Sequence, residues 1–137
     1  MLMGELLTLV EHDLPVKVVV FNNSSYNFVE VEMKADGFVN FGTELTNPDF
    51  SKVAEACGLA GFRTDKSKDL PKVVKQFLDH DGPALLDVEV ERQELTIPPA
   101  ISAAQAKGFT LYSLRTVLSG RGDELIDLAR ANLRQLF

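Results

Sequence analysis

Two adjacent asparagines, Asn22 and Asn23, have side-chain oxygens that could bind a hard cation. They directly follow residues 16–21, an apolar and mostly β-branched run that is typical of a buried strand, which we expect to be parallel. In open α/β sheets, ligands bind outside the carboxyl ends of such strands. A neutral Asn oxygen suits Mg²⁺ that also holds diphosphate oxygens, because Mg²⁺ prefers oxygen donors and such a site is already crowded with anions. The pair therefore predicts a metal–diphosphate site, while a polar turn after a strand is the commoner explanation of such a pair taken alone.

The segments that would position this pair alternate between helical and extended patterns. Their order is helix, strand, helix, helix, strand, helix, strand, which is typical of a parallel sheet with right-handed crossovers. Three strands leave two exposed edges, so the sequence predicts an α/β fold with an incomplete doubly wound parallel sheet that self-associates. The predicted helices cover residues 1–13, 28–35, 50–57 and 70–78, and the predicted strands cover residues 16–21, 59–64 and 84–90. A loop is expected at residues 38–48. Gly37 is expected to end the second helix, and Asp69 to be the N-cap of the fourth.

The pattern changes after residue 90, where a polar stretch replaces the apolar strand. We expect Lys107-Gly108 to break a short helix, and residues 111–118 to form a second short apolar face. Asp123 is predicted to be the N-cap of a last helix. An apolar strip flanked by arginines is typical of helices at a membrane surface, but a helix docked on its own domain has the same pattern. The strip consists of Leu125, Ile126, Ala129, Leu133 and Leu136.

Length and composition limit the possible classes of function. A chain of 137 residues with 45% apolar residues is an ordinary soluble composition, and we divide it into residues 1–93 with the sheet and a helical tail at 94–137. A net charge of −6 argues against a general nucleic-acid binder. The single cysteine, Cys57, cannot form an internal disulfide, which indicates a reducing compartment, and we expect it to be a buried small apolar residue. The apolar residues 1–10 lack the basic region that precedes the apolar part of a signal peptide. His12 and His80 have no metal-ligand spacing with Cys57.

Several motifs resemble thiamin diphosphate-dependent enzymes, and most of all the pyruvate oxidase, or pyruvate:quinone oxidoreductase, branch. The resemblance to the cofactor domain lies in residues 1–7, 15–24, 28–34 and 82–88. Residues 105–109 and 119–124 are similar to the C-terminal tail of the membrane-associated, quinone-reducing members. In the family a Gly-Asp-Gly motif precedes the Asn-Asn pair, and no such motif stands before Asn22. The resemblance therefore implies the C-terminal part of a longer enzyme, inactive by itself.

Carried over to this sequence, the resemblance implies that Asn23 gives a side-chain oxygen and Ser25 a backbone carbonyl to Mg²⁺. Phe28 matches an aromatic near the thiamin that is linked to electron transfer, and Glu32 matches a carboxylate near the substrate pocket. Without the family, Phe28 is a core anchor and Glu32 a solvated charge. Relatives usually have Gly at Asn27, although Asn tolerates left-handed backbone. The implied cofactor-binding residues are Asn23, Ser24, Ser25, Tyr26, Asn27, Phe28 and Val29.

The resemblance also implies a tail that covers the active site at rest and binds phospholipid after pyruvate and reduced flavin shift it. The residues expected at the lipid surface are Arg115, Arg121, Leu125, Ile126, Arg130, Leu133, Arg134, Leu136 and Phe137.

The reaction implied for the parent enzyme is oxidative decarboxylation of pyruvate to acetate and CO₂. Electrons pass through FAD, held by a domain that this sequence lacks, to a membrane quinone. The parent would be a homo-oligomer in the cytoplasm, associated peripherally with the inner face of the membrane. Two alternatives stay open: a carboligase of the acetolactate synthase type, whose expected lack of the tail counts against it, and a non-catalytic lipid-binding or regulatory module.

Overall fold

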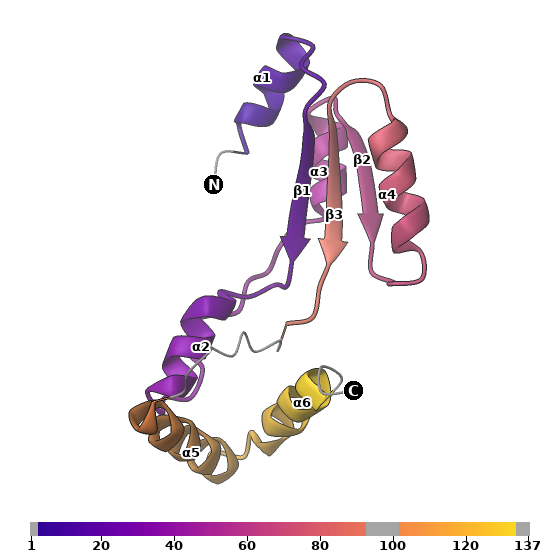
Figure 1. Cartoon of the computed structure of the whole chain (residues 1–137). Coiled ribbons are helices and arrows are strands. Elements are labelled where there is room, and N and C mark those ends of the chain that lie inside the picture. Colours follow the sequence, from indigo (N-terminus) through magenta and orange to yellow (C-terminus); the bar gives the residue numbers. More distant parts are fainter. Residues whose placement is uncertain (1–2, 93–101, 134–137) are drawn as a thin grey trace. The chain divides into compact units, whose positions relative to one another are not determined.

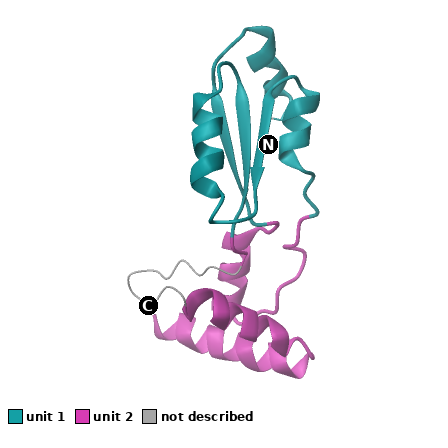
Figure 2. Ribbon diagram, turned by 90° about the vertical axis from the view of Figure 1, so that its right-hand side faces the viewer, with its two compact units in different colours: residues 1–23, 46–90 teal, residues 24–45, 91–137 magenta. Residues whose placement is uncertain are grey.

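The computed structural model describes residues 3–92 and 102–133, which form two compact units. Unit 1 consists of residues 1–23 and 46–90, and unit 2 of residues 24–45 and 91–137, coloured teal and magenta in Figure 2. The predicted domain boundary at residues 93 and 94 lies outside the described residues and stays a prediction. Unit 1 contains α1 (Glu5–Glu11), β1 (Lys17–Asn22), α3 (Phe50–Ala56), β2 (Ala60–Thr64), α4 (Leu70–Asp79) and β3 (Ala84–Glu89), and unit 2 contains α2 (Asn27–Ala35), α5 (Ala103–Leu118) and α6 (Gly122–Leu133).

A three-stranded parallel sheet organises unit 1, with β3 between β1 and β2 (Figure 1). Both outer strands start level with β3, since Lys17 and Ala60 are each paired with Ala84. This confirms the predicted α/β class, its parallel sheet and the order of elements along the chain. Every described residue of β3 except Glu89 is buried, as expected for a central strand with helices on both faces.

Alternate residues of β3 supply the two apolar cores of unit 1. Leu85 packs with α1 and α3 on one face, and Leu86 packs with α4 on the other. The edge strand β1 is covered less well: Val19 is 43% exposed and Phe21 is 74% exposed. The buried members of the first core are Leu6, Phe50, Ala54, Leu59 and Leu85, and those of the second are Phe77, Ala84, Leu86 and Val88.

Some local predictions for unit 1 need correction. Asp69 lies at the start of α4 as predicted, but its side chain makes no capping hydrogen bond. Cys57 is only half-buried, although it packs against the first core. The described part of the first helix begins at Glu5.

In unit 2, α2 and α5 pack closely at Gly108. A Cβ atom at this position would lie 1.7 Å from the carbonyl oxygen of Ala35, so only glycine allows the two backbones this close. The predicted helix break at Lys107-Gly108 is therefore wrong, because α5 is continuous through it and the glycine serves a helix contact. The predicted glycine stop is confirmed, since α2 ends just before Gly37, which has a φ of +82°.

The last helix also differs in detail from the prediction. It begins at Gly122, so Asp123 lies in its first turn, where a carboxylate favours the helix dipole, and is not its N-cap. Its buried residue is Leu128, which is not part of the predicted strip, whereas Ile126 and Leu133 are 54% and 53% exposed. In the described ranges no helix combines the length and apolarity needed to cross a bilayer.

Candidate functional site

The two asparagines at the end of β1 have different surroundings. Asn22 is buried, its side-chain oxygen accepts a 2.9 Å hydrogen bond from the amide of Asn47, and its carbonyl accepts one from the N–H of Val90. These bonds anchor the end of the strand. Asn23, the predicted metal ligand, is the next residue of unit 1 and is half-buried. The structure thus gives Asn22 a structural role, and the ligand role of Asn23 stays a prediction.

The segment that follows leads into a helix N-terminus in unit 2. Ser24 has a φ of +53°, which turns the chain, and α2 then begins at Asn27. Tyr26 occupies the N-cap position, and its side chain makes no capping hydrogen bond. Backbone N–H groups at such an end favour an anion, because the helix itself offers them no carbonyl partner. The segment therefore fits the diphosphate role predicted for residues 24–29.

Phe28 and Glu32 both lie on an exposed side of α2. They are four residues apart, and Phe28 is 77% exposed. The alternative of Phe28 as a core anchor is therefore wrong. The neighbours Tyr26 and Val29 are also exposed, at 56% and 47%, so this end of α2 presents apolar surface.

A buried carboxylate, Glu30, lies on the opposite side of α2 and was missed by the sequence analysis. Its Oε1 accepts hydrogen bonds from the hydroxyls of Ser25 and Thr43, at 2.6 and 2.9 Å, and from the guanidinium of Arg92 at 3.1 Å. Its Oε2 accepts from Lys34 and Asn40, each at 3.5 Å. A Glu and a Lys four residues apart on a helix are common, and nothing in their spacing distinguishes a buried pair from an exposed one.

Burial and neighbouring groups shift the pKa values of both Glu30 and Lys34. Burial raises the pKa of Glu30, but the hydrogen bonds from Ser25, Thr43 and Arg92 and the charge of Lys34 more than offset this, so the pKa lies below its ordinary value. Burial lowers the pKa of Lys34 against the opposing charge of Glu30. Glu30 is 0% exposed and Lys34 is 1% exposed. Both oxygens of Glu30 thus have donors within unit 2, and the cluster forms an ionic core.

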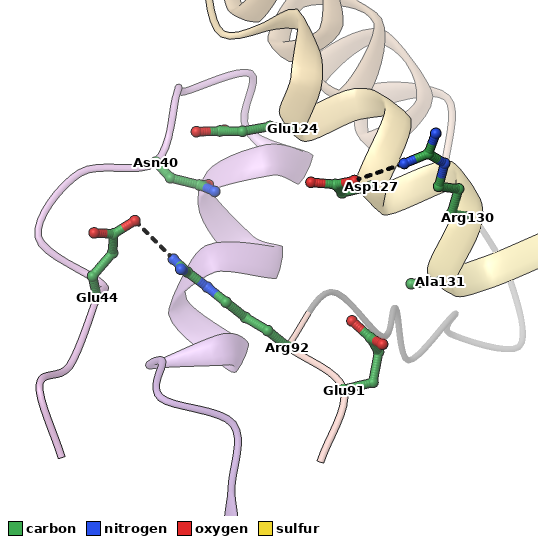
Figure 3. A pocket seen from close by; sticks show the side chains of 8 residues that line it. All are labelled: Asn40, Glu44, Glu91, Arg92, Glu124, Asp127, Arg130 and Ala131. Carbon is green, nitrogen blue, oxygen red and sulfur yellow. Dashed lines mark hydrogen bonds and ion pairs between the residues drawn. The ribbon is translucent and has the colours of Figure 1, made fainter. Parts of the chain in front are cut away.

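A cavity of about 420 Å³ lies beside this cluster in unit 2 (Figure 3). Arg92 points toward Glu44 at 3.1 Å, and Arg130 pairs with Asp127 at 3.6 Å. Carboxylates outnumber arginines in the lining, but no described residues form a group of three carboxylates, histidines or cysteines placed to hold a metal ion. The lining residues are Asn40, Glu44, Glu91, Arg92, Glu124, Asp127, Arg130 and Ala131.

Two of the arginines predicted to lie at a lipid surface donate hydrogen bonds to other residues of unit 2. Arg115 donates to the carbonyl of Gly37 at 2.7 Å, and Arg121 donates to the carbonyl of Asn40 at 3.1 Å and to Glu124 at 2.6 Å.

The other predicted lipid-surface residues differ in exposure. Leu125 is half-buried, whereas Ile126, Arg130 and Leu133 are exposed. Arg134, Leu136 and Phe137 lie outside the described residues.

A parallel α/β sheet whose first strand ends at Asn22, with the chain continuing through Asn23 into a helix N-terminus, has the arrangement at which phosphate groups commonly bind in α/β domains. Comparison with protein families makes this specific. Residues 1–88, more than half of the chain, match the family described as "Thiamine pyrophosphate enzyme, C-terminal TPP binding domain", and the chain belongs to this family.

Individual relatives include enzymes of more than one activity. The chain is 33% identical over all 137 residues to a putative thiamine pyrophosphate-containing protein of Bacillus subtilis, of which it spans 24%. It is 36% identical over 94 residues, 66% of the chain, to a pyruvate oxidase of Lactiplantibacillus plantarum. It is 35% identical over 99 residues, 72% of the chain, to the mitochondrial acetolactate synthase catalytic subunit of Saccharomyces cerevisiae. The chain spans 15% of the pyruvate oxidase and 14% of the synthase.

Proposed function

We propose that this chain forms part of the thiamin diphosphate–Mg²⁺ site of a pyruvate oxidase-like enzyme. One observation carries the proposal: in a member of the thiamine pyrophosphate enzyme family, a parallel strand ends at Asn22, and the chain leads through Asn23 directly into the start of α2. Oxygen donors for the metal and helix N-terminal N–H groups for the anion are the two requirements of a metal–diphosphate ligand.

In this proposal Asn23 gives its side-chain oxygen and Ser25 its backbone carbonyl to Mg²⁺. The backbone of residues 24–29 binds the diphosphate, and the left-handed turn at Ser24 directs the chain into that helix start. When bound, thiamin diphosphate supplies the electron sink for decarboxylation. Phe28 and Glu32, both exposed on α2, would face the thiamin and the substrate. The donors on this chain are neutral, so the remaining charge of the metal site would come from other residues of the enzyme.

Titration with the cofactor tests the site. In the protein that carries this chain, Asn23→Ala should weaken Mg²⁺ binding, measured calorimetrically at saturating thiamin diphosphate, by at least ~10-fold. Thermal stabilisation by the cofactor should fall in parallel, because a ligand stabilises only the state that binds it. Gln76→Ala, at an exposed position of α4, is the control and should bind as the wild type does. Equal binding by Asn23→Ala would reject the site.

The reaction proposed for the enzyme is oxidation of pyruvate to acetate and CO₂, with electrons passing through FAD to a membrane quinone. The acetolactate synthases among the relatives support a carboligase equally well. Product analysis separates the two: acetate formed together with reduction of a quinone analogue supports the oxidase, and acetolactate formed without an acceptor supports the carboligase. The proposed homo-oligomer is tested by light scattering, in which a monomeric mass would contradict it.

We further propose that the tail binds a phospholipid surface through the exposed face of α6. Ile126, Arg130 and Leu133 are exposed on this helix, which gives apolar contacts beside a positive charge. Leu133→Asp should reduce co-sedimentation of the enzyme with anionic vesicles in the presence of pyruvate and cofactor. Leu78→Asp, at an exposed position of α4, is the matched control. Unchanged co-sedimentation of the Leu133 variant would contradict this role.

A further inference from the structure

Glu30 holds together segments of unit 2 that are far apart in the sequence. Its five donors come from the segment before α2, from α2 itself, from residues 40 and 43, and from Arg92 after β3. Both of its oxygens are occupied, and the residue has no exposed surface. Glu30 therefore cannot itself reach a ligand, and whatever it contributes must pass through the groups that it binds.

The group closest to the proposed cofactor site is Ser25. Its hydroxyl donates to Glu30 at 2.6 Å, the shortest of the five contacts. The backbone beside it is also fixed, because the N–H of Tyr26 donates to the carbonyl of Thr43 and the N–H of Leu45 donates to the carbonyl of Ser24, each at 2.9 Å. The hydroxyl of Thr43 donates to the same carboxylate oxygen of Glu30. One buried oxygen thus joins both sides of this backbone pairing.

We propose that Glu30 is a positioning residue for the metal–diphosphate site. It holds Ser25, and through Ser25 the backbone of residues 24–29, in the conformation that binds Mg²⁺ and diphosphate. Arg92, which follows β3 in the sequence, donates to the same carboxylate oxygen as Ser25. This inference rests on the proposed function, since it assigns a support to the same site.

Partners of metal ligands commonly have measurable effects on affinity. Removing a hydrogen-bonded group behind a ligand typically weakens metal binding by about 10–100-fold, because the ligand is no longer held in its binding orientation. A buried carboxylate that served only the stability of unit 2 would have a different signature. Its loss would lower protection of α2 and α5 but leave the affinity of the folded protein for the metal unchanged.

The test compares Glu30→Gln with Ser25→Ala and with the double variant. Glutamine has nearly the same shape but lacks the charge, and Ser25→Ala removes the hydroxyl while keeping the backbone carbonyl. Each single variant should raise the Kd for Mg²⁺ by ~10-fold at saturating thiamin diphosphate, measured by calorimetry on the folded protein. The double variant should show no more than the same ~10-fold increase, because Glu30→Gln weakens, by loss of the acceptor's charge, the same contact that Ser25→Ala removes. Asp36→Asn, which neutralises an exposed carboxylate at the other end of α2, is the control and should bind as the wild type does.

The outcomes separate this inference from the proposed function. No binding by the wild type overturns the proposed function, and this inference with it. Wild-type binding with a Kd of Glu30→Gln within twofold of it overturns only the positioning role. A ~100-fold increase in the double variant would also overturn it, because the two residues would then act independently.

Discussion

The two units of this chain have cores of opposite character. Unit 1 buries mainly leucine, phenylalanine, valine and alanine on both faces of a parallel sheet, with Asp87 as a fully buried carboxylate paired with Arg63. Unit 2 buries Glu30, Lys34, Thr43 and Thr116 together with Tyr112, and its aliphatic contribution from α6 is Leu128. Apolar burial is non-directional and stabilises in proportion to area, whereas buried polar groups stabilise only while each keeps its partner. The stability of unit 1 should therefore fall most when apolar side-chain volume is removed from its core. The stability of unit 2 should fall most when a buried polar group loses its partner or when the close contact between its helices is disturbed.

The largest effect is expected from truncating the apolar core of unit 1. Phe77 is 2% exposed and packs edge to face on Phe62, with ring centroids 5.9 Å apart. Phe77→Ala should cost about 3–5 kcal/mol, because transfer and cavity contributions add. Native-state hydrogen exchange would show this as lost protection in β3. Leu78→Ala, at a neighbouring position that is 61% exposed, should change stability by less than ~0.5 kcal/mol. An equal loss of protection in α5 would mean that the two units unfold together.

The next effect probes the fit of unit 2 by adding volume. Gly108→Ala would place its Cβ on the backbone oxygen of Ala35, so α5 must move, at a cost of about 2–3 kcal/mol. Loss of protection should centre on α5 and leave β3 unchanged. Gly122→Ala is the matched control, because a Cβ there has no atom within 4 Å. A Gly108 variant as stable as this control would show that the close helix contact contributes nothing.

Removing one partner from the ionic core tests the second half of the comparison. Lys34 lies 3.5 Å from Glu30, and its ammonium lies 5.8 Å from the ring centroid of Tyr112. Lys34→Met keeps the length of the side chain but leaves Glu30 with one cation fewer, and we expect a loss of about 2 kcal/mol in unit 2. Arg92 and the two hydroxyls remain as donors, which limits the loss. Lys75→Met, which breaks an exposed pair with Asp79, should cost under ~0.5 kcal/mol. If the Lys34 variant were more stable than the wild type, the buried charge of Lys34 would be destabilising.

The sequence predicted the structure of unit 1 better than the core of unit 2. The parallel sheet of unit 1 was predictable because β1 and β3 are largely apolar runs and β2 is a short segment that follows a glycine, and such patterns are decided locally. The end of β1 at Asn22 was predictable for the same reason. The core of unit 2 was not, because Glu30 meets Thr43 and Arg92 only after the chain has folded.

Two helix predictions failed for related physical reasons. A glycine inside a helical pattern indicates a break when only propensity is considered, yet Gly108 is required by a neighbouring backbone. In α6 apolar residues occur on more than one side of the helix, so sequence periodicity alone does not show that Leu128 is buried while Ile126 and Leu133 are exposed. For Gly108 the deciding partner, Ala35, is remote in sequence.

A smaller effect is expected at the start of α5 in unit 2. Ser102 and Gln105 form a reciprocal capping box: the hydroxyl accepts from the N–H of Gln105 at 3.2 Å, and the Gln105 side chain accepts from the N–H of Ser102 at 2.9 Å. Ser102→Ala should cost about 1 kcal/mol and increase hydrogen exchange only in the first turn of α5. Ser102→Asp keeps an acceptor and should retain the protection of the wild type. Equal loss in both variants would contradict the capping role.

The smallest effect compares this neutral cap with the charged cap of α3 in unit 1. Asp49 accepts from the N–H groups of Ser51 and Lys52, at 3.1 and 3.3 Å. The hydrogen bond from the hydroxyl of Ser51 is the main reason that the pKa of Asp49 is lowered, and the charges of Arg63 and Lys52 add to it. A folded pKa below that of the unfolded chain means that this stabilisation is present above about pH 4 and is lost as the pH falls through the folded pKa.

Hydrogen exchange between pH 5 and pH 2, corrected for the intrinsic exchange rate, should therefore show the amides of Ser51 and Lys52 losing protection. The amide of Gln105 should keep its protection over this range, since no titratable group caps α5. Asp49→Asn retains the acceptor without the charge and should remove the pH dependence at α3. Parallel loss at both caps would instead indicate general acid unfolding, and the difference between the two units would then lie in their cores alone.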